Sequence, residues 1–262
     1  MKLLKYFFYL RQFLLKILVP ELLWKKYINV DGVPIPLRDM PFSFGVKLSI
    51  SCGEYELPER ILCSMVLEKG MKVIEMGTSV GILAGIIAHK IGATGKLITI
   101  EASPKKIRIA SSWLLHHYPN IKIIRGYGFP CAEVPGDIFV KDFHEATATL
   151  GGEVEYVFKK NKNMKKDLIP LLDINKLENE YLLDNADLLV ADVEGAEEIL
   201  LLSEVSFPKK LKNIVMETHP AKYKKTDDLQ NIILKICNSG FTVIHQIENS
   251  YLFSRLEKKL IN

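Results

Sequence analysis

The chain has 262 residues, of which 48% are hydrophobic and 25% are charged, so it can bury the core of one large α/β domain with short additions. Its formal net charge of +4 is too small to indicate nucleic acid as a partner. The four cysteines are scattered and form no C-x-x-C pair. A disulfide framework and a zinc site are therefore not expected, and reduced thiols in a cytoplasmic protein are.

Residues 1–26 are predicted to form a basic amphipathic helix, separate from a domain that spans residues 27–262. Arg11 and Lys16 interrupt every apolar run well short of the roughly 20 residues that a membrane span needs. A helix with its basic residues on one face and a broad apolar face opposite can lie on an anionic membrane, so residues 1–19 are a candidate for peripheral contact at the inner membrane face. The same periodicity fits packing on the rest of the chain or on a second subunit.

Strand and helix patterns alternate through the rest of the chain, after a small β hairpin that Asp31-Gly32 marks. The expected strands are 72–76, 97–101, 121–125, 187–192, 213–219, 241–247 and 251–254. The expected helices are 58–68, 80–90, 104–117, 196–203 and 227–238. Alternation of this kind predicts a mostly parallel sheet. The last two strands are too close in sequence for a crossover, so they are expected to pair antiparallel.

Residues 126–172 break this alternation and are predicted to be an insertion. The segment contains possible short strands at 137–140 and 153–158 and a basic run at 159–166. A long insertion in an α/β enzyme is often a lid or wall for the substrate. The lysines could contact an anionic acceptor, although a solvated loop is the more ordinary interpretation of such a run.

The first core strand leads into a glycine-punctuated turn that is typical of a nucleoside-cofactor site. Glu75, Gly77 and Gly81 form the pattern E-x-G-x-x-x-G, and the next strand ends at Glu101. Glycine permits a tight turn and close approach of the backbone to a ligand. A carboxylate that closes the second strand is placed to accept hydrogen bonds from a ribose diol.

The details of this turn favour S-adenosylmethionine over a dinucleotide. A nicotinamide or flavin fingerprint requires G-x-G-x-x-G, whereas a third glycine is missing here. Glu75 would repel a pyrophosphate but suits the ammonium and sulfonium of S-adenosylmethionine. The residues predicted to bind the cofactor are Glu75, Gly77, Thr78, Ser79, Gly81, Glu101, Ala102 and Asp192. An NAD-dependent oxidoreductase and a corner without any ligand are the alternatives.

Acidic residues and a histidine follow the later strands. Asp192 and Glu194 come at the end of one apolar strand, and Glu217 and His219 at the end of the next. Ligands of open α/β sheets bind outside the carboxyl ends of the strands. These four side chains are therefore expected in the same crevice as the cofactor, and an acid on an apolar strand needs a partner or a chemical role.

The segment D-V-E-G-A-E at 192–197, together with E-T-H at 217–219, closely resembles the FkbM-type methyltransferases. So do G-E-Y-E at 53–56 and I-P-L-L-D at 169–173, and the resemblance covers roughly residues 50–220. It implies a class I methyltransferase (Rossmann-like) fold and S-adenosylmethionine as cofactor. It also implies O-methylation of a hydroxyl on a small molecule, a sugar or glycan, or a secondary metabolite, with Tyr55 and Glu194 as candidate substrate contacts.

Methyl transfer to an alcohol is an in-line displacement that needs a partner for the hydroxyl proton. His219 is the preferred base, with Asp192 and Glu217 as further catalytic candidates. Asp192 and Glu217, with Glu194, could instead hold a magnesium ion, because oxygen ligands suit a hard cation. A cofactor-binding protein without catalysis is the non-enzymatic alternative, and it would be expected to lose Asp192, Glu194 or His219.

Overall fold

A computed structural model describes residues 25–130, 139–141, 155–157, 169–180, 186–201 and 204–255. The chain divides into two compact units, with the boundary between Leu57 and Pro58. The predicted N-terminal helix and the basic run at 159–166 lie outside the described residues, so both stay predictions. In the part of the chain that is described, no helix combines the length and apolar character needed to cross a membrane.

The first unit contains the predicted β hairpin. Strands β1 (Ile28–Val30) and β2 (Val33–Ile35) pair antiparallel around Asp31 and Gly32, which both have positive φ. The Gly32 amide donates to Asn29 Oδ1 over 2.9 Å and closes the turn. Helix α3 (Phe44–Ser51) follows, capped by a hydrogen bond of 3.3 Å from the Val46 amide to Ser43 Oγ. The hairpin prediction is therefore confirmed, whereas the sequence analysis did not predict α3.

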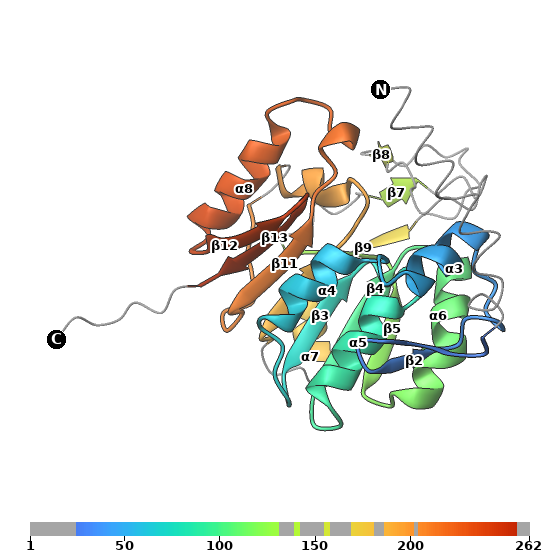
Figure 1. The fold of residues 1–262 in the computed structure, drawn as a ribbon. Coiled ribbons are helices and arrows are strands. Elements are labelled where there is room, and N and C mark those ends of the chain that lie inside the picture. Colours follow the sequence, from blue (N-terminus) through green and yellow to red (C-terminus); the bar gives the residue numbers. More distant parts are fainter. Residues whose placement is uncertain are drawn as a thin grey trace, which may run out of the picture. The chain divides into compact units, whose positions relative to one another are not determined.

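The second unit is built on a seven-stranded sheet of order β12-β13-β11-β10-β3-β4-β5 (Figure 1). Its strands are β3 (Lys72–Met76), β4 (Lys96–Glu101), β5 (Ile121–Arg125), β10 (Leu188–Ala191), β11 (Asn213–Glu217), β12 (Thr242–Ile247) and β13 (Ser250–Ser254). Neighbours from β5 to β11 are parallel, and β13 runs antiparallel to β11 and β12. This order, with the antiparallel strand β13 inserted between β11 and β12, is the class I methyltransferase fold, as predicted.

The helices of this unit are α4 (Leu57–Ser64), α5 (Ile82–Ile91), α6 (Pro104–His117), α7 (Ile174–Glu180) and α8 (Asp228–Asn238). Two 3₁₀ helices, η1 (Ala196–Leu201) and η2 (Pro220–Lys222), follow β10 and β11. Strand β10, at the centre of the sheet, is continuously apolar because both faces of a parallel sheet are covered, and all four of its residues are buried. Buried strands of this kind hold their carboxyl ends in fixed positions, which matters for the site.

The predicted insertion forms part of a smaller four-stranded sheet of order β6-β9-β7-β8. Its strands are β6 (Tyr127–Phe129), β7 (Phe139–Lys141), β8 (Glu155–Val157) and β9 (Ile169–Asp173). Strand β6 pairs parallel with β9, and β7 pairs antiparallel with both β8 and β9. The two short strands expected at 137–140 and 153–158 therefore correspond to β7 and β8, with shifted ends.

Candidate functional site

An open cleft with about 460 Å³ of empty space lies at the carboxyl ends of β3, β4 and β10. It is lined by Met76, Gly77, Ser79, Ile100, Glu101, Ala102, Lys106, Gly126, Tyr127, Gly128, Asp192, Val193 and Glu194. Its position is the one that ligands take in open α/β sheets. Six residues predicted to contact the cofactor or substrate line it.

Gly77 allows the turn after β3 to pass directly against the end of β10. Its φ is +97°, and a Cβ at this position would lie 1.8 Å from the carbonyl oxygen of Asp192. The Gly77 amide donates to the Ile100 carbonyl over 2.8 Å, and the Asp192 amide donates to the Met76 carbonyl over 2.9 Å. Backbone hydrogen bonds thus hold the ends of β3, β4 and β10 together around Gly77, which has no side chain.

Glu101 is fixed at the wall of the cleft by two backbone hydrogen bonds. Its Oε2 accepts from the Ser79 amide and its Oε1 from the Ser103 amide, both over 2.8 Å. Burial raises the pKa of this carboxyl, while the nearby Lys106 ammonium and the two amides oppose that effect. Each oxygen retains a further lone pair, so the group is oriented in advance to accept hydrogen bonds from a diol.

Replacing Glu101 with alanine is expected to weaken S-adenosylmethionine binding by roughly 1.5–3 kcal/mol, or about 10- to 150-fold, through lost charge-assisted hydrogen bonds. Titration calorimetry measures this directly. The exposed Glu68→Ala variant is the control, since Glu68 is not among the residues that line the cleft. An unchanged affinity in Glu101→Ala would exclude Glu101 as the ribose ligand.

Glu75 does not line the cleft, although the sequence predicts it to bind the cofactor. It is 1% exposed, and its Oε2 accepts a hydrogen bond from the Thr99 hydroxyl, which in turn pairs with the Thr78 hydroxyl. Its Oε1 has no hydrogen-bond partner among the described residues. Burial raises the pKa of Glu75 to about 8. A neutral carboxyl that supports the turn from within the sheet fits these observations better than a contact with an ammonium group.

Glu75→Gln is therefore expected to remove a pH dependence of stability. With a pKa raised from 4.5 to about 8, the folded chain keeps a proton that the unfolded chain loses, so stability falls as the pH rises through this window. The variant should gain roughly 1–3 kcal/mol, or about 2–10 °C in Tm, over the wild type at pH 8 and little at pH 4. Thermal denaturation at both pH values tests this, with Glu68→Gln as the control. An equal gain at both pH values would contradict it.

Thr78 and Gly81 also lie off the cleft lining. Thr78 is 2% exposed and belongs to the hydroxyl chain that ends at Glu75. Gly81 caps α5 with a φ of +91° and packs against the Leu114 side chain. Tyr55, the other predicted substrate contact besides Glu194, is buried within the first unit, and its predicted role is not tested by the structure.

His219 is held rigidly by one carboxylate. Strand β11 ends at Glu217, two residues before it, so His219 lies in the turn that leads into η2 and not on the strand face that the sequence predicts. Its Nδ1 lies 3.0 Å from Glu197 Oε1, which also accepts from the Gly195 amide over 3.2 Å. The Tyr223 hydroxyl donates to Glu197 Oε2 over 3.1 Å and accepts from the His219 amide over 3.0 Å. Glu197 thus orients the imidazole.

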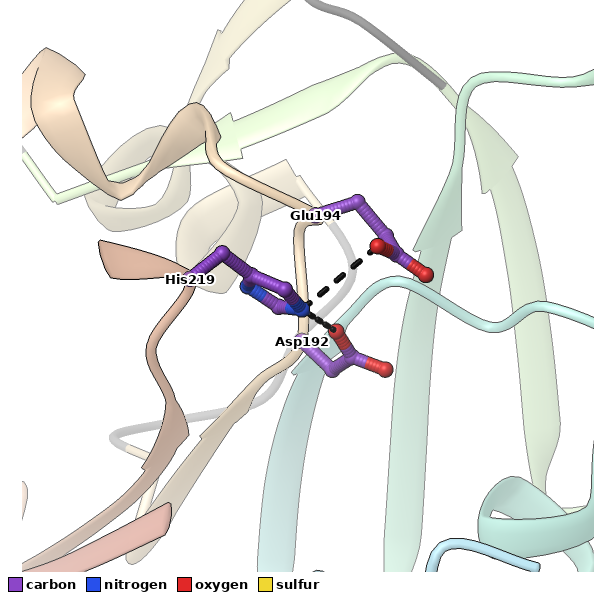
Figure 2. A group of neighbouring side chains, drawn as sticks. All are labelled: Asp192, Glu194 and His219. Atoms are coloured by element: carbon purple, nitrogen blue, oxygen red, sulfur yellow. Dashed lines mark ion pairs between the residues drawn. The ribbon is translucent and has the colours of Figure 1, made fainter. Parts of the chain in front are cut away.

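The other ring nitrogen faces three more carboxylates. His219 Nε2 lies 3.5 Å from Glu194 Oε2, 3.7 Å from Asp192 Oδ1 and 3.8 Å from Glu217 Oε2. Figure 2 shows Asp192 and Glu194 converging on this nitrogen from the turn after β10. The Lys222 ammonium donates to Glu194 Oε2. The structure therefore brings together the four residues that the sequence places after β10 and β11, and it adds Glu197 and Lys222.

The acidic cluster, formed by Asp192, Glu194, Glu197 and Glu217, places four carboxylates within 4 Å of the His219 imidazole. Burial, followed by the charges of Glu217 and Glu194, raises the pKa of Asp192 well above its usual value. Burial and the charge of Glu59, a buried acid that accepts from Ser250 Oγ, raise the pKa of Glu217 to about 7. Burial lowers the pKa of His219, but the hydrogen bond to Glu197 and the surrounding carboxylates outweigh it and raise the pKa to about 9. The carboxylates around His219 therefore favour the charged form of its imidazole.

Sequence reasoning missed Glu197, Lys106 and the segment 126–128. Glu197 closes the D-V-E-G-A-E segment at 192–197, so this motif could have indicated Glu197 as a site residue. Gly126 directly follows the end of β5, which is a further signal for a ligand site, and Gly128 lies in the middle of β6. A Cβ on Gly128 would lie 2.7 Å from Ile100 Cδ1 and 2.8 Å from Met76 Cγ.

Comparison with known proteins gives partial matches. The family model of protein-L-isoaspartate(D-aspartate) O-methyltransferase matches residues 26–131. The protein-L-isoaspartate O-methyltransferase of Methanococcus aeolicus is 40% identical over 92 residues, or 34% of this chain and 41% of that protein. The enzyme of the same name from Methanothermobacter thermautotrophicus is 32% identical over 111 residues, or 40% of this chain and 48% of that protein. The chain thus spans less than half the length of these relatives.

Two solved structures resemble the chain at low identity. Fibrillarin from Aeropyrum pernix, with natively bound S-adenosyl-L-methionine, has a TM-score of 0.43 at 13% identity, covering 76% of this chain and 73% of that one. A TehB-like S-adenosylmethionine-dependent methyltransferase from Corynebacterium glutamicum has a TM-score of 0.44 at 10% identity, covering 81% of this chain and 95% of that one.

The family model that matches describes protein-L-isoaspartate(D-aspartate) O-methyltransferases and not the FkbM type that the sequence resembles. It ends at residue 131, before Asp192 and His219, so it concerns the cofactor half of the site and not the acidic cluster.

Proposed function

We propose that the chain is an S-adenosylmethionine-dependent O-methyltransferase that acts on a hydroxyl group of a sugar, a glycan or a secondary metabolite. Three observations support the cofactor. The sheet has the class I methyltransferase order, the cleft lies at its strand ends, and Glu101 is oriented toward that cleft by two backbone amides. The partial match to an O-methyltransferase family over residues 26–131 covers the same half of the site.

The acidic cluster around His219 is the reason for proposing a hydroxyl, and not a carboxylate, as the methyl acceptor. Asp192 and Glu194 both line the cleft and approach His219 Nε2, so the cofactor pocket and the cluster share two residues. An isoaspartyl acceptor, named for the relatives, presents a carboxylate, which is already deprotonated and needs no partner for a proton. A hydroxyl is neutral, donates hydrogen bonds to carboxylates, and must lose a proton during transfer. The cluster suits the hydroxyl.

The residues then divide the reaction between them. Glu101 holds the ribose of the cofactor, and Asp192 and Glu194 hold the acceptor next to the methyl group. The acceptor oxygen attacks in line, so that the oxygen–carbon bond forms as the carbon–sulfur bond of the sulfonium breaks. The hydroxyl proton passes to a carboxylate of the cluster that Asp192, Glu217 and His219 form. The products are a methyl ether and S-adenosylhomocysteine.

Two measurements test this proposal. Calorimetry should detect S-adenosylmethionine binding and no NAD binding, and the reverse result would favour an oxidoreductase. Methyl-labelled S-adenosylmethionine should then transfer label to components of glycan or lipid-linked sugar extracts. Isoaspartyl peptides, which test carboxyl methylation as the alternative, should receive no label. Label on the peptide alone would replace the hydroxyl proposal with carboxyl methylation.

A further inference from the structure

The surroundings of His219 fix which ring nitrogen carries a proton. Glu197 Oε1 accepts from the Gly195 amide and faces Nδ1 at 3.0 Å, so Nδ1 must donate to it. A neutral imidazole then presents a lone pair at Nε2. Three carboxylate oxygens lie 3.5–3.8 Å from that nitrogen, so a positive charge between them stabilises this arrangement.

The distances are longer than hydrogen bonds and suit ligands that surround a common ion. One ligand atom from each of Asp192, Glu194 and His219 can be chosen so that all lie within 4.8 Å of one another. Asp192 Oδ1 is buried and has no hydrogen-bond partner among the described residues. Figure 2 shows the three side chains directed at the same point.

We propose that Asp192, Glu194 and His219 bind one divalent first-row transition-metal cation, of the class of Mn²⁺. The proposal deepens the proposed function, because it places a cation at the acceptor end of the same site. One imidazole and two carboxylates form a mixed set that suits such ions, whereas Mg²⁺ prefers oxygen ligands alone. The sequence suggested magnesium on Asp192 and Glu217, and the geometry substitutes His219 for Glu217 as a ligand.

The hydrogen bonds around His219 are those expected around a metal-binding histidine. A metal-bound imidazole usually donates its other N–H to a carboxylate, which fixes the ring, and Glu197 accepts in that way. The Tyr223 hydroxyl in turn holds Glu197. With Nε2 bound to the cation, the acceptor proton falls to a carboxylate of the cluster and not to the ring.

Lys222 is the cation that competes for this site within the chain. Its ammonium donates to Glu194 Oε2, and its stem lies over Gly195, where an added Cβ would be 3.1 Å from Lys222 Cβ. In the absence of a metal ion, Lys222 and a proton on Nε2 offset part of the negative charge of the carboxylates. Removing the ammonium should therefore tighten metal binding and leave the three ligands in place.

The test is a titration of the full chain with Mn²⁺ alone, followed by electron paramagnetic resonance. We expect one ion per chain, a nitrogen coupling from the imidazole in the spin-echo spectrum, and weaker binding of Mg²⁺ in competition. His219→Gln and Asp192→Asn should remove stoichiometric binding, and Glu197→Gln should weaken it about 10- to 100-fold. Lys222→Met should strengthen it.

Exposed residues of the same types provide matched controls, namely His245→Gln and Glu204→Gln. If the His219 variant fails to fold by circular dichroism, Glu194→Gln tests the same prediction at a partly exposed position. Absence of stoichiometric binding, absence of the nitrogen coupling, or equal binding by the site variants and the controls would overturn the proposal. S-adenosylmethionine calorimetry on the same samples separates the two claims, because intact cofactor binding without Mn²⁺ binding refutes the metal site alone.

Discussion

Replacing Gly77 with alanine is expected to destabilise the second unit by roughly 3 kcal/mol or more and to abolish S-adenosylmethionine binding. The added Cβ would lie 1.8 Å from the Asp192 carbonyl oxygen and 2.9 Å from its carbonyl carbon, both backbone atoms, at a φ of +97°. Relief requires the ends of β3 and β10 to separate, which disrupts the wall of the cleft. Thermal denaturation and calorimetry measure the two effects.

The control for this substitution is Gly45→Ala in α3. A Cβ at Gly45 would meet no atom within 4 Å, and its φ lies outside the positive range. Because alanine is the better helix former, this variant should be neutral or stabilised by up to about 1 kcal/mol. If Gly77→Ala melted like the wild type and bound the cofactor equally well, the close approach of the two strand ends would be wrong.

His219→Ala is expected to lower turnover by about 10²- to 10⁴-fold while cofactor affinity barely changes. The substitution removes the nitrogen on which Asp192, Glu194 and Glu217 converge, so these carboxylates lose the group that organises them. His219 is not among the residues that line the cofactor cleft. Turnover is measured with the acceptor identified from the labelled extracts, and binding by calorimetry.

His245→Ala is the matched control, since His245 is exposed on β12. Full activity of His219→Ala in metal-free buffer would refute both a proton-transfer and a metal-binding role for this residue. The carboxylates would then serve to hold the acceptor hydroxyls, and alignment alone would account for catalysis. A parallel loss of cofactor affinity would instead place His219 in the cofactor pocket.

The sequence predicts the fold well because its signals are local. Apolar strands, the glycine turn after β3 and the short connection between β12 and β13 are each read from a few adjacent residues. The parallel order then follows from the helices between strands, and the carboxyl ends of β10 and β11 bring Asp192, Glu194, Glu217 and His219 to one edge.

The details that the sequence does not reveal depend on pairing between distant residues. Glu75 lies opposite Thr99 of β4 in the register of the sheet, and this partner keeps its carboxyl within the sheet and off the cleft lining. The bond from Glu197 to His219 spans 22 positions and depends on the 3₁₀ helix after β10, where an α-helix is expected. No local sequence pattern predicts either contact.

The chemical nature of the methylated product tests the central claim most directly. Methyl ethers withstand mild alkali, whereas methyl esters are hydrolysed and release methanol. After transfer from methyl-labelled S-adenosylmethionine to the extract acceptor, alkali-stable label in the wild type, with little label in His219→Ala, is the result expected for a hydroxyl acceptor. Label released as volatile methanol would show a carboxyl acceptor and contradict the assignment of the acidic cluster to a hydroxyl.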